Sequence, residues 1–467
     1  MTSADELLDA ARRAVRAAGG ETLARAVGER SLTARLARSA PTQATDVRRV
    51  RVEVLCVRDG HTGLAMTTRL DDDALAAAAR QAHDAAAAAA HAGPGDYPGL
   101  PAPAAARGHE GFDAATAALD PRQAGEAMVA ALAAASAAGV ELAGTWAAGA
   151  VTEAIATSHG LEATDAVTDA QFKAVAGPLG GLRGYAARTA VAAGSIDVAA
   201  VADEAIAKAT GGGSPREPID PLGGARAAEL PVVLGPDAVA ELLDMLSAMA
   251  FDGRAWAEGR SALSGRLGQR VAAPGVSLSD SVRFPGTLPR GFDAEGVPKA
   301  PIPLIQDGVA HRVVHDVRSA AWAGGAQAST GHATTPGGAV GGPAPRNLVL
   351  AGGGADDEAE LVAPVERGLY VTRLWYLNPV RAKETLVTGV TREGTFVIED
   401  GRIAGPAREV RFTDSVLRLL SETEALTRRP RLVGTTQFYG LRFAYGVVCP
   451  ALRARGFRVT AASSSGG

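Results

Sequence analysis

The residues of this chain that could bind a metal or act as nucleophiles are few and widely spaced. His311 and His315 are four positions apart in the stretch HRVVH, a spacing that would put both imidazoles on one face of a helix. The stretch follows the turn signal Asp307-Gly308 and alternates like a strand, in which residues four apart lie about 13 Å from each other. No second cluster of ligand residues accompanies the pair, so we expect a strand here and no metal site.

Two further histidines and the two cysteines stand alone. His109 lies in a Pro/Gly-rich segment without a partner histidine three or four residues away, so we expect a surface residue. His332 lies in the glycine-rich stretch STGHATTPGG, where a solvated loop residue is the favoured interpretation. Cys56 and Cys449 lie in apolar stretches and are expected to be buried structural thiols. A nucleophilic Cys449 would need a group that lowers its pKa, and no histidine follows His332 in the sequence.

Composition excludes several classes of protein. The 467 residues are 47% hydrophobic and 21% charged, which is typical of a globular protein of two or three domains. The net charge of −4 gives no indication of a nucleic-acid partner. Two cysteines fit a reducing cytosol, and neither a signal peptide nor a membrane span is expected, so we predict a cytoplasmic protein. Motifs for phosphate binding and for serine hydrolases are absent from the sequence.

The N-terminal part predicts helices on either side of antiparallel strands. Ser3 and Glu6 form a capping box at the start of an amphipathic helix. Residues 49–56 alternate apolar and polar side chains, and Asp59-Gly60 is a hairpin signal. A second helix is expected over 72–91, so this part predicts a module of helices and antiparallel strands.

The chain as a whole predicts an α+β fold. We expect an N-terminal α+β module over 1–91, a Pro/Gly-rich linker over 92–123 and a middle α+β segment over 124–228. The remainder, 229–467, is rich in short β-branched and aromatic runs separated by turns, which predicts a C-terminal domain of antiparallel sheets.

One amphipathic helix is predicted near the start of that last domain. Pro236 takes the first helical position, where its missing N–H costs nothing. The apolar face contains Val239, Leu242, Leu243, Leu246 and Ala250, at three- and four-residue spacing. The polar residues of the same helix are Asp237, Glu241, Asp244 and Ser247.

Several stretches resemble one known family. The stretch 370–379 reads Y-V-x-x-L-x-Y-x-N-P, and the segment up to residue 403 continues with T-G and then with the turn I-E-D-G. The turn FDAEGVP (292–298) and the stretch SGRLG (264–268) add to the pattern. These features resemble the TldD/PmbA family of bacterial peptidases, and the resemblance extends over nearly the whole chain.

The resemblance also shows what this chain lacks. Zinc-bearing members of the family carry HExxxH on the helix that precedes SGRLG. Here Asp244 stands at the position of the first histidine, Met245 at that of the glutamate and Met249 at that of the second histidine. The family's third ligand, a cysteine, corresponds to a position near Thr436 and not to Cys449. Zinc prefers imidazole, thiolate or carboxylate ligands, so the resemblance implies the PmbA (TldE) branch, without a metal site or catalytic residue of its own.

The family implies a partner and a substrate. A TldD-type chain would supply the zinc and the general base in a cytosolic heterodimer, and this chain would need no cofactor. Extended peptides, unfolded or ribosomally made, would enter a chamber, for which Arg373, Tyr376, Asn378 and His332 are candidate lining residues. Core packing of Trp375 or Tyr376 is the favoured alternative. The family's older association with DNA gyrase control is also implied, but the charge distribution does not support DNA contact.

Two alternatives remain open at this point. The chain could be a homodimeric peptide-binding protein without protease activity. It could also be an independent hydrolase that uses Cys449 or the pair His311 and His315. In that case activity would belong to this chain alone, whereas the resemblance implies a chain that is inactive alone and part of an active heterodimer.

Overall fold

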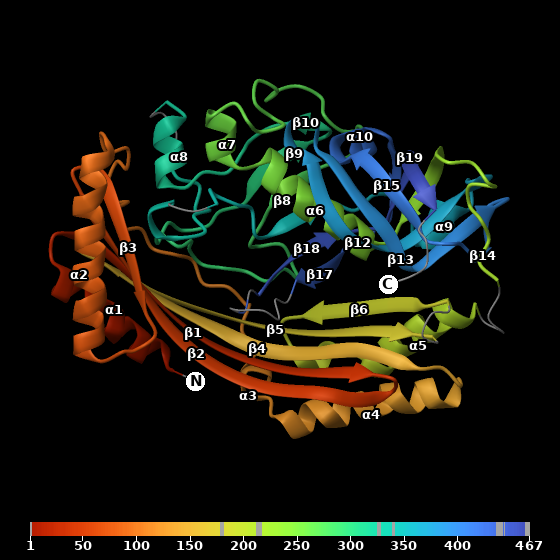
Figure 1. Cartoon of the computed structure of the whole chain (residues 1–467), viewed down its shortest axis with the longest axis horizontal. Helices are drawn as coiled ribbons and strands as arrows, with labels where there is room; N and C mark the ends of the chain where they lie inside the picture. Colours follow the sequence, from red (N-terminus) through yellow and green to blue (C-terminus); the bar gives the residue numbers. More distant parts are fainter. Residues whose placement is uncertain are drawn as a thin grey trace.

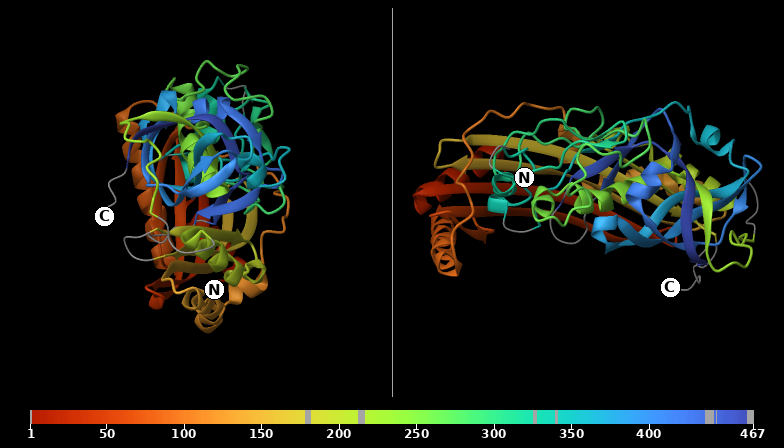
Figure 2. Two further views of the ribbon diagram at one scale, coloured as in Figure 1. Left: turned by 90° about the vertical axis from the view of Figure 1, so that its right-hand side faces the viewer. Right: turned by 90° about the horizontal axis from the view of Figure 1, so that it is seen from above.

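The computed structural model describes residues 2–177, 182–211, 217–324, 328–338, 341–435, 442 and 444–462. A long curved sheet is built from the N-terminal half of the chain, and the C-terminal domain lies over one of its faces (Figure 1). Seen from above, the strands of this sheet extend along the molecule beneath that domain (Figure 2). The α+β fold class predicted from the sequence is confirmed.

The N-terminal sheet is antiparallel throughout, in the order β3-β2-β1-β4-β5-β6. Its strands are β1 (Glu21–Ala37), β2 (Ala40–Arg58), β3 (His61–Thr67), β4 (Leu142–Thr157), β5 (Glu162–Ala176) and β6 (Gly184–Ala190). Because β1 pairs with β4, the predicted segments 1–91 and 124–228 contribute to one sheet.

Helices cover one face of this sheet. They are α1 (Ala4–Ala18), α2 (Asp72–Ala89), α4 (Pro121–Ala137) and α5 (Val198–Thr210). The predicted capping box of Ser3 and Glu6 is present at the start of α1. Small side chains such as Ala24 and Ala26 on β1 pack against the helices, which allows them to approach the sheet closely. No described helix combines the length and the apolar composition that crossing a bilayer requires.

The other face of the sheet meets the C-terminal domain. Since successive side chains of a strand point to opposite faces, Arg25 and Val27 of β1 face away from the helices. Val27 packs with Val151 of β4 and with Val349 and Val448 of the C-terminal domain. The predicted linker contains the short helix α3 (Ala114–Ala118), and its Tyr97 is buried.

A closed ring of strands forms the far part of the C-terminal domain. Its order is β12-β7-β19-β15-β13, and β13 pairs back with β12. These strands are β7 (Ala228–Leu234), β12 (Arg367–Arg381), β13 (Leu386–Glu399), β15 (Val410–Ser415) and β19 (Leu452–Ala462), with β14 (Arg402–Pro406) beside β13 and β16 (Thr423–Leu426) beside β19. The pair β12 and β7 is parallel, so this domain is not purely antiparallel as the sequence had suggested.

A second sheet of the C-terminal domain lies nearer to the N-terminal sheet. Its order is β10-β9-β8-β11-β18-β17, and β11 and β18 are also parallel. The strands are β8 (Leu278–Asp280), β9 (Ile302–Gln306), β10 (Val309–Ala310), β11 (Leu348–Leu350), β17 (Arg431–Thr435) and β18 (Tyr445–Cys449). The predicted strand through His311 and His315 is therefore wrong beyond Ala310, where the chain continues as a loop.

The helix predicted at residue 236 is α6 (Pro236–Ala250), and it lies at the centre of the C-terminal domain (Figure 1). Its apolar face joins the largest hydrophobic cluster, together with strands of the ring and of the second sheet. The remaining helices are short: α7 (Gly253–Ala257), α8 (Val317–Trp322), α9 (Glu358–Val362) and α10 (Val416–Ser421).

Candidate functional site

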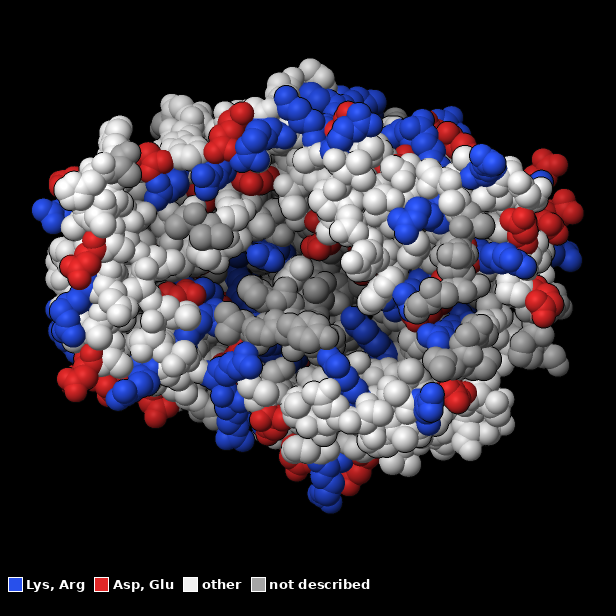
Figure 3. Space-filling view, in the orientation of Figure 1, with Lys and Arg blue, Asp and Glu red and all other residues white. Residues whose placement is uncertain are grey.

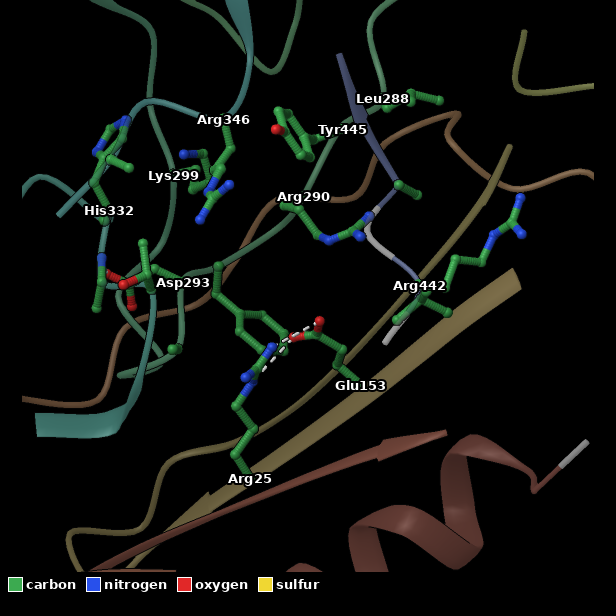
Figure 4. Close-up of a pocket in the computed structure, with 18 of the residues that line it drawn as sticks. Arg25, Glu153, Leu288, Arg290, Asp293, Lys299, His332, Arg346, Arg442 and Tyr445 are labelled. Carbon is green, nitrogen blue, oxygen red and sulfur yellow. Dashed lines mark hydrogen bonds and ion pairs between the residues drawn. The ribbon is translucent and has the colours of Figure 1, made fainter. Parts of the chain in front are cut away.

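A pocket lies between the N-terminal sheet and the C-terminal domain, and we call it the interdomain pocket. Its walls come from β1, β2 and β4 on one side and from loops around residues 288–299, 331–334, 344–346 and 442–445 on the other. Its volume is about 90 Å³. The molecular surface is hollowed at the centre of the face in Figure 3, where Lys and Arg side chains line the walls. Figure 4 shows the charged residues around the pocket itself.

Neighbouring strands place an ion-pair network on the sheet side of the pocket. Arg25 of β1 is the cross-strand partner of Glu53 of β2, and its Nη1 lies 3.0 Å from Oε2 of Glu53. Its Nη2 lies 2.8 Å from Oε1 of Glu153 on β4. Arg51 adds a contact from Nε to Oε1 of Glu53 at 3.2 Å. Burial alone would raise the pKa of Glu153, but the charges of Arg25 and Arg290 and the hydrogen bond from Arg25 together outweigh it, and the pKa is lowered.

The opposite wall contains a buried group around Asp280. Its carboxylate accepts backbone hydrogen bonds from Arg346 (2.7 Å) and Asn347 (2.8 Å). Lys299 Nζ lies 3.5 Å and His332 Nε2 lies 3.3 Å from its Oδ1. Burial opposes ionisation, yet the Lys299 charge, the neighbouring His332 and the backbone donors hold the pKa of Asp280 well below its usual range. Asp280 therefore stays charged and neutralises Lys299.

His332 is not the solvated loop residue expected from the sequence. Only 2% of the residue is exposed, although it lies in a loop, and it lines the interdomain pocket. Burial and the nearby Lys299 lower the pKa of His332, so its imidazole is neutral near pH 7. The glycine-rich composition of the loop gave no signal for this burial, which depends on contacts with distant strands.

The turn predicted at residues 292–298 buries two carboxyl groups. Asp293 accepts hydrogen bonds from the backbone N–H groups of Glu295 (2.9 Å), Val297 (3.0 Å) and Ala333 (2.8 Å). Gly296 has a φ of +82°, which closes the turn in a conformation that favours glycine. Burial raises the pKa of Asp293 to about 6, and burial together with Asp293 raises that of Glu295 to about 8. Glu295 is therefore mostly protonated near neutral pH.

The helix positions corresponding to the zinc motif do not form a metal site in the described part of the chain. Asp244 lies in the middle of α6, where it has a hydrogen bond with Tyr445 and where the charge of Arg346 is close. Burial still raises the pKa of Asp244 above its usual range. Met249 instead packs in the main hydrophobic cluster, with Met245 against its edge. Among the described residues, no three His, Cys, Asp or Glu side chains are grouped so that they could hold a metal ion.

Arg346 and Tyr445 occupy the space next to Asp244. The Arg346 guanidinium lies 5.1 Å from the centroid of the Tyr445 ring, in a cation–π arrangement. A cationic side chain beside Asp244 disfavours a bound divalent cation at the same place. The residue types at and around these positions of α6 therefore do not fit zinc, because one carboxylate, two thioethers and a guanidinium are a poor donor set.

The predicted chamber residues on β12 lie away from His332. Arg373 lies with its guanidinium 4.4 Å from the ring centroid of Tyr185 on β6 and 4.7 Å from that of Trp375. Its Nη1 also pairs with Oε2 of Glu393 at 2.8 Å. Arg373 therefore bridges the C-terminal domain and the N-terminal sheet, whereas only His332 of the four predicted residues lines the interdomain pocket.

The favoured interpretation of Trp375 or Tyr376 as core residues is wrong. Trp375 is 43% exposed and Tyr376 is 77% exposed. The pairing of β12 with β13 shifts between Trp375 and Asn378, and Tyr376 has a φ of +56°, so a bulge turns these side chains outward. Asn378 donates a hydrogen bond to the carbonyl oxygen of Tyr376 (2.9 Å) and is exposed as well.

The remaining histidines do not converge. His315 is buried with its ring edge toward Trp256, 6.4 Å between centroids, whereas His311 is exposed. Their side chains therefore do not share one environment. His109 is not a plain surface residue: its Nε2 lies 2.7 Å from Oδ1 of Asp165, and the side chain is only 13% exposed.

Both cysteines are buried free thiols, as predicted. Cys449 donates a hydrogen bond to the carbonyl oxygen of Pro236 (3.2 Å), and burial raises its pKa well above the usual range. Such a thiol is a poor nucleophile. The position near Thr436, which the resemblance linked to the third zinc ligand, lies outside the described residues.

Sequence reasoning did not single out Arg290, Arg346 or Asp280. These residues lie in separate loops and strands, and each has an ordinary local sequence around it. Only the packing of the C-terminal domain on the sheet brings them to one pocket. A usable signal would have been the basic residue Arg290 placed directly before the acidic turn at 292–298.

Comparisons with known proteins agree with this architecture. Residues 227–461 match the family described as PmbA/TldA metallopeptidase C-terminal domain. A protein named metalloprotease from Methanothermobacter thermautotrophicus is 28% identical over 174 residues. That match covers 36% of this chain and only 36% of the length of the curated relative.

Solved structures match nearly the whole chain. The crystal structure of TldE from Thermococcus kodakarensis superimposes with a TM-score of 0.82 at 19% identity, over 98% of this chain and 100% of that one. A putative modulator of a DNA gyrase from Thermotoga maritima gives 0.81 at 19% identity, with the same coverage. A similar protein from Bacteroides thetaiotaomicron gives 0.76 at 18%, covering 98% of both chains. At these identities the likeness shows a shared fold.

Proposed function

The chain belongs to the PmbA/TldD metallopeptidase family, and we propose that it is a subunit without a metal centre that works with a zinc-bearing TldD-type chain. The single observation that carries this proposal is the donor set at Asp244, Met245 and Met249. Two thioethers cannot replace imidazoles as zinc ligands, and the Arg346 charge lies near the one carboxylate. The zinc and the general base of peptide hydrolysis would therefore come from the partner.

We further propose extended peptides, unfolded or ribosomally made, as the substrate of the complex. Lys and Arg side chains surround the hollow between the N-terminal sheet and the C-terminal domain (Figure 3), and Asp237, Glu241 and Asp244 follow one face of α6. Lys173 and Tyr185 approach them from the sheet, closely enough that the charges of Asp237 and Glu241 act to raise the pKa of both groups. A folded protein would not fit such a space, but a single extended strand could be held by backbone hydrogen bonds. The cytoplasm, where both thiols would stay reduced, is the proposed compartment.

Reconstitution tests this proposal directly. Cleavage of an unstructured peptide is measured with this chain alone, with a TldD-type chain alone and with both together. We expect cleavage with the mixture, none with this chain alone, and co-elution of the two chains on size-exclusion chromatography. Cleavage by this chain alone, or stoichiometric zinc in it, would overturn the assignment.

A homodimeric peptide-binding protein is the alternative from another functional class. It would bind peptides at the same walls but would form no complex with a TldD-type chain. Peptide binding by a self-associated chain that ignores the added partner would favour this alternative.

A further inference from the structure

Basic side chains outnumber acidic ones in the lining of the interdomain pocket. Six basic side chains line it, namely Arg25, Arg51, Arg290, Lys299, Arg346 and Arg442, against the two carboxylates of Glu153 and Asp293. Several of the cations are neutralised by carboxylates on the pocket wall or behind it. Arg25 and Arg51 pair with glutamates of the sheet, Lys299 lies near Asp280, and Arg442 pairs with Asp169.

Arg290 differs from these neighbours. It is half-buried, and its one hydrogen bond runs from Nη1 to the carbonyl oxygen of Pro289 (3.2 Å). It forms no ion pair with a carboxylate of the described residues. Its charge still acts at longer range on Glu153 and Asp165, where it contributes to lowering the pKa of both carboxyl groups. Most of the donors of this guanidinium are therefore available to another molecule.

The surroundings strengthen the attraction of this guanidinium for an anion. Arg346 and Lys299 line the same pocket, and protein walls reduce the screening by water. In the view of Figure 4, Arg290 lies between Tyr445 and the ion pair of Arg25 and Glu153. The volume of about 90 Å³ exceeds the roughly 10–15 Å³ that one water needs. It therefore accommodates a small group such as a carboxylate with its attached carbon atoms.

The geometry points to a carboxylate-binding subsite in the interdomain pocket, with Arg290 as its main ligand, that anchors a carboxylate of the extended peptide. Most N–H donors of the Arg290 guanidinium have no acceptor among the described residues, and the planar fork that they form fits the two oxygens of a carboxylate. A dianion such as phosphate is less suited, because Glu153 and Asp293 line the same pocket. This inference rests on the proposed role in peptide binding and adds a substrate preference to it. The carboxylate comes either from the C-terminus of the peptide or from an Asp or Glu side chain.

The test compares three versions of one unstructured peptide without other acidic residues. The first ends in a free carboxylate, the second in an amide, and the third in an amide with one internal Glu. Calorimetric titration of the full-length chain, and of its complex with a TldD-type chain, gives the affinity for each. At least one of the two peptides with a carboxylate is expected to bind about tenfold more tightly than the neutral peptide. The peptide that gains affinity identifies the source of the carboxylate.

Variants locate the preference in the pocket. Arg290→Gln is expected to abolish the difference between the charged and neutral peptides, and Arg290→Lys to keep part of it. Arg122→Gln is the matched control, because this arginine is 80% exposed on α4, outside the pocket, and its loss should change nothing. If Arg290→Gln does not fold, the wild-type chain still provides a test, since the preference must decrease as salt is added.

The outcomes separate this inference from the proposed function. Equal binding of all three peptides would overturn the subsite while leaving the role in peptide binding intact. A preference that persists in Arg290→Gln, or that does not respond to salt, would also overturn it. Failure of every peptide to bind both the chain and its complex would overturn the subsite and the proposed function together.

Discussion

Arg442 and Asp169 form an ion pair that connects the C-terminal domain to the N-terminal sheet. Nε of Arg442 lies 2.8 Å from Oδ1 of Asp169, and the two side chains are 0% and 1% exposed. Nη1 of Arg442 also donates to the hydroxyl of Ser31 on β1 (2.8 Å), and its backbone N–H donates to Glu29 (2.8 Å). The residues in contact lie up to 413 positions apart in sequence, so Arg442 is one of the residues that hold the two sides of the pocket together.

The first prediction concerns this ion pair. Asp169→Ala leaves the Arg442 guanidinium buried without its counter-charge, which costs roughly 3–5 kcal/mol in comparable cases. We expect a clear decrease in the urea concentration at the midpoint of unfolding, followed by circular dichroism. Arg122→Ala removes an exposed ion pair with Glu126 and should change the free energy of unfolding by less than about 0.5 kcal/mol. Equal effects of the two substitutions would contradict the structural role of Asp169.

The second prediction is a pH dependence of stability. The folded chain holds the proton of Glu295 up to about pH 8, whereas the ordinary pKa of 4.5 applies when the chain is unfolded. Between these values the folded state binds more protons than the unfolded state, so the contribution of Glu295 to the free energy of unfolding falls as pH rises. Urea unfolding at several pH values from 5 to 8 measures this slope.

Glu295→Gln provides the comparison for the pH profile. A neutral amide resembles the protonated acid, so it can still bond to Tyr97 and to the backbone N–H of Val317, as Glu295 does at 3.1 Å and 2.9 Å. The variant is expected to lose part of the decrease in stability toward pH 8. An unchanged slope would show that Glu295 is ionised in the folded chain.

The third prediction concerns the thiols. Burial raises the pKa of both Cys56 and Cys449, and the thiolate is the reactive form. Iodoacetamide at pH 8 should therefore label neither residue in the native chain and both after urea is added, as followed by mass spectrometry. Rapid labelling of native Cys449 would contradict this prediction and support the alternative of a cysteine hydrolase.

The fourth prediction tests the exposed part of β12. Trp375→Ala removes an aromatic face that covers the Arg373 guanidinium, and we expect about tenfold slower peptide cleavage by the complex with a TldD-type chain. The cost in stability should be modest, about 1–3 kcal/mol, because Trp375 is 43% exposed and only part of its apolar surface is buried. Val129→Ala, at a 63% exposed position on α4, is the control and should leave cleavage unchanged. Normal cleavage by the complex with the Trp375 variant would show that Trp375 on this strand is not part of the proposed chamber wall.

Local signals predicted the helices well. Ser3 with Glu6 satisfies N–H groups within three residues, and Pro236 starts α6 at the predicted residue. These features depend on neighbours along the chain, so the sequence contains them in full. The strand expected through His311 and His315 was wrong, because an alternating pattern over a few residues does not fix whether a partner strand is present.

The properties of the candidate site depended on residue type in part and on tertiary contacts for the rest. The sequence by itself determined that Asp244, Met245 and Met249 are a poor set of zinc ligands, because ligand chemistry depends on residue type. Tertiary structure alone decided that His332 is buried, that Tyr376 is exposed and that Arg290 lines the interdomain pocket. These properties arise from contacts between segments far apart in the chain. Burial and electrostatic interaction act through space, and no local pattern records which distant charges will meet.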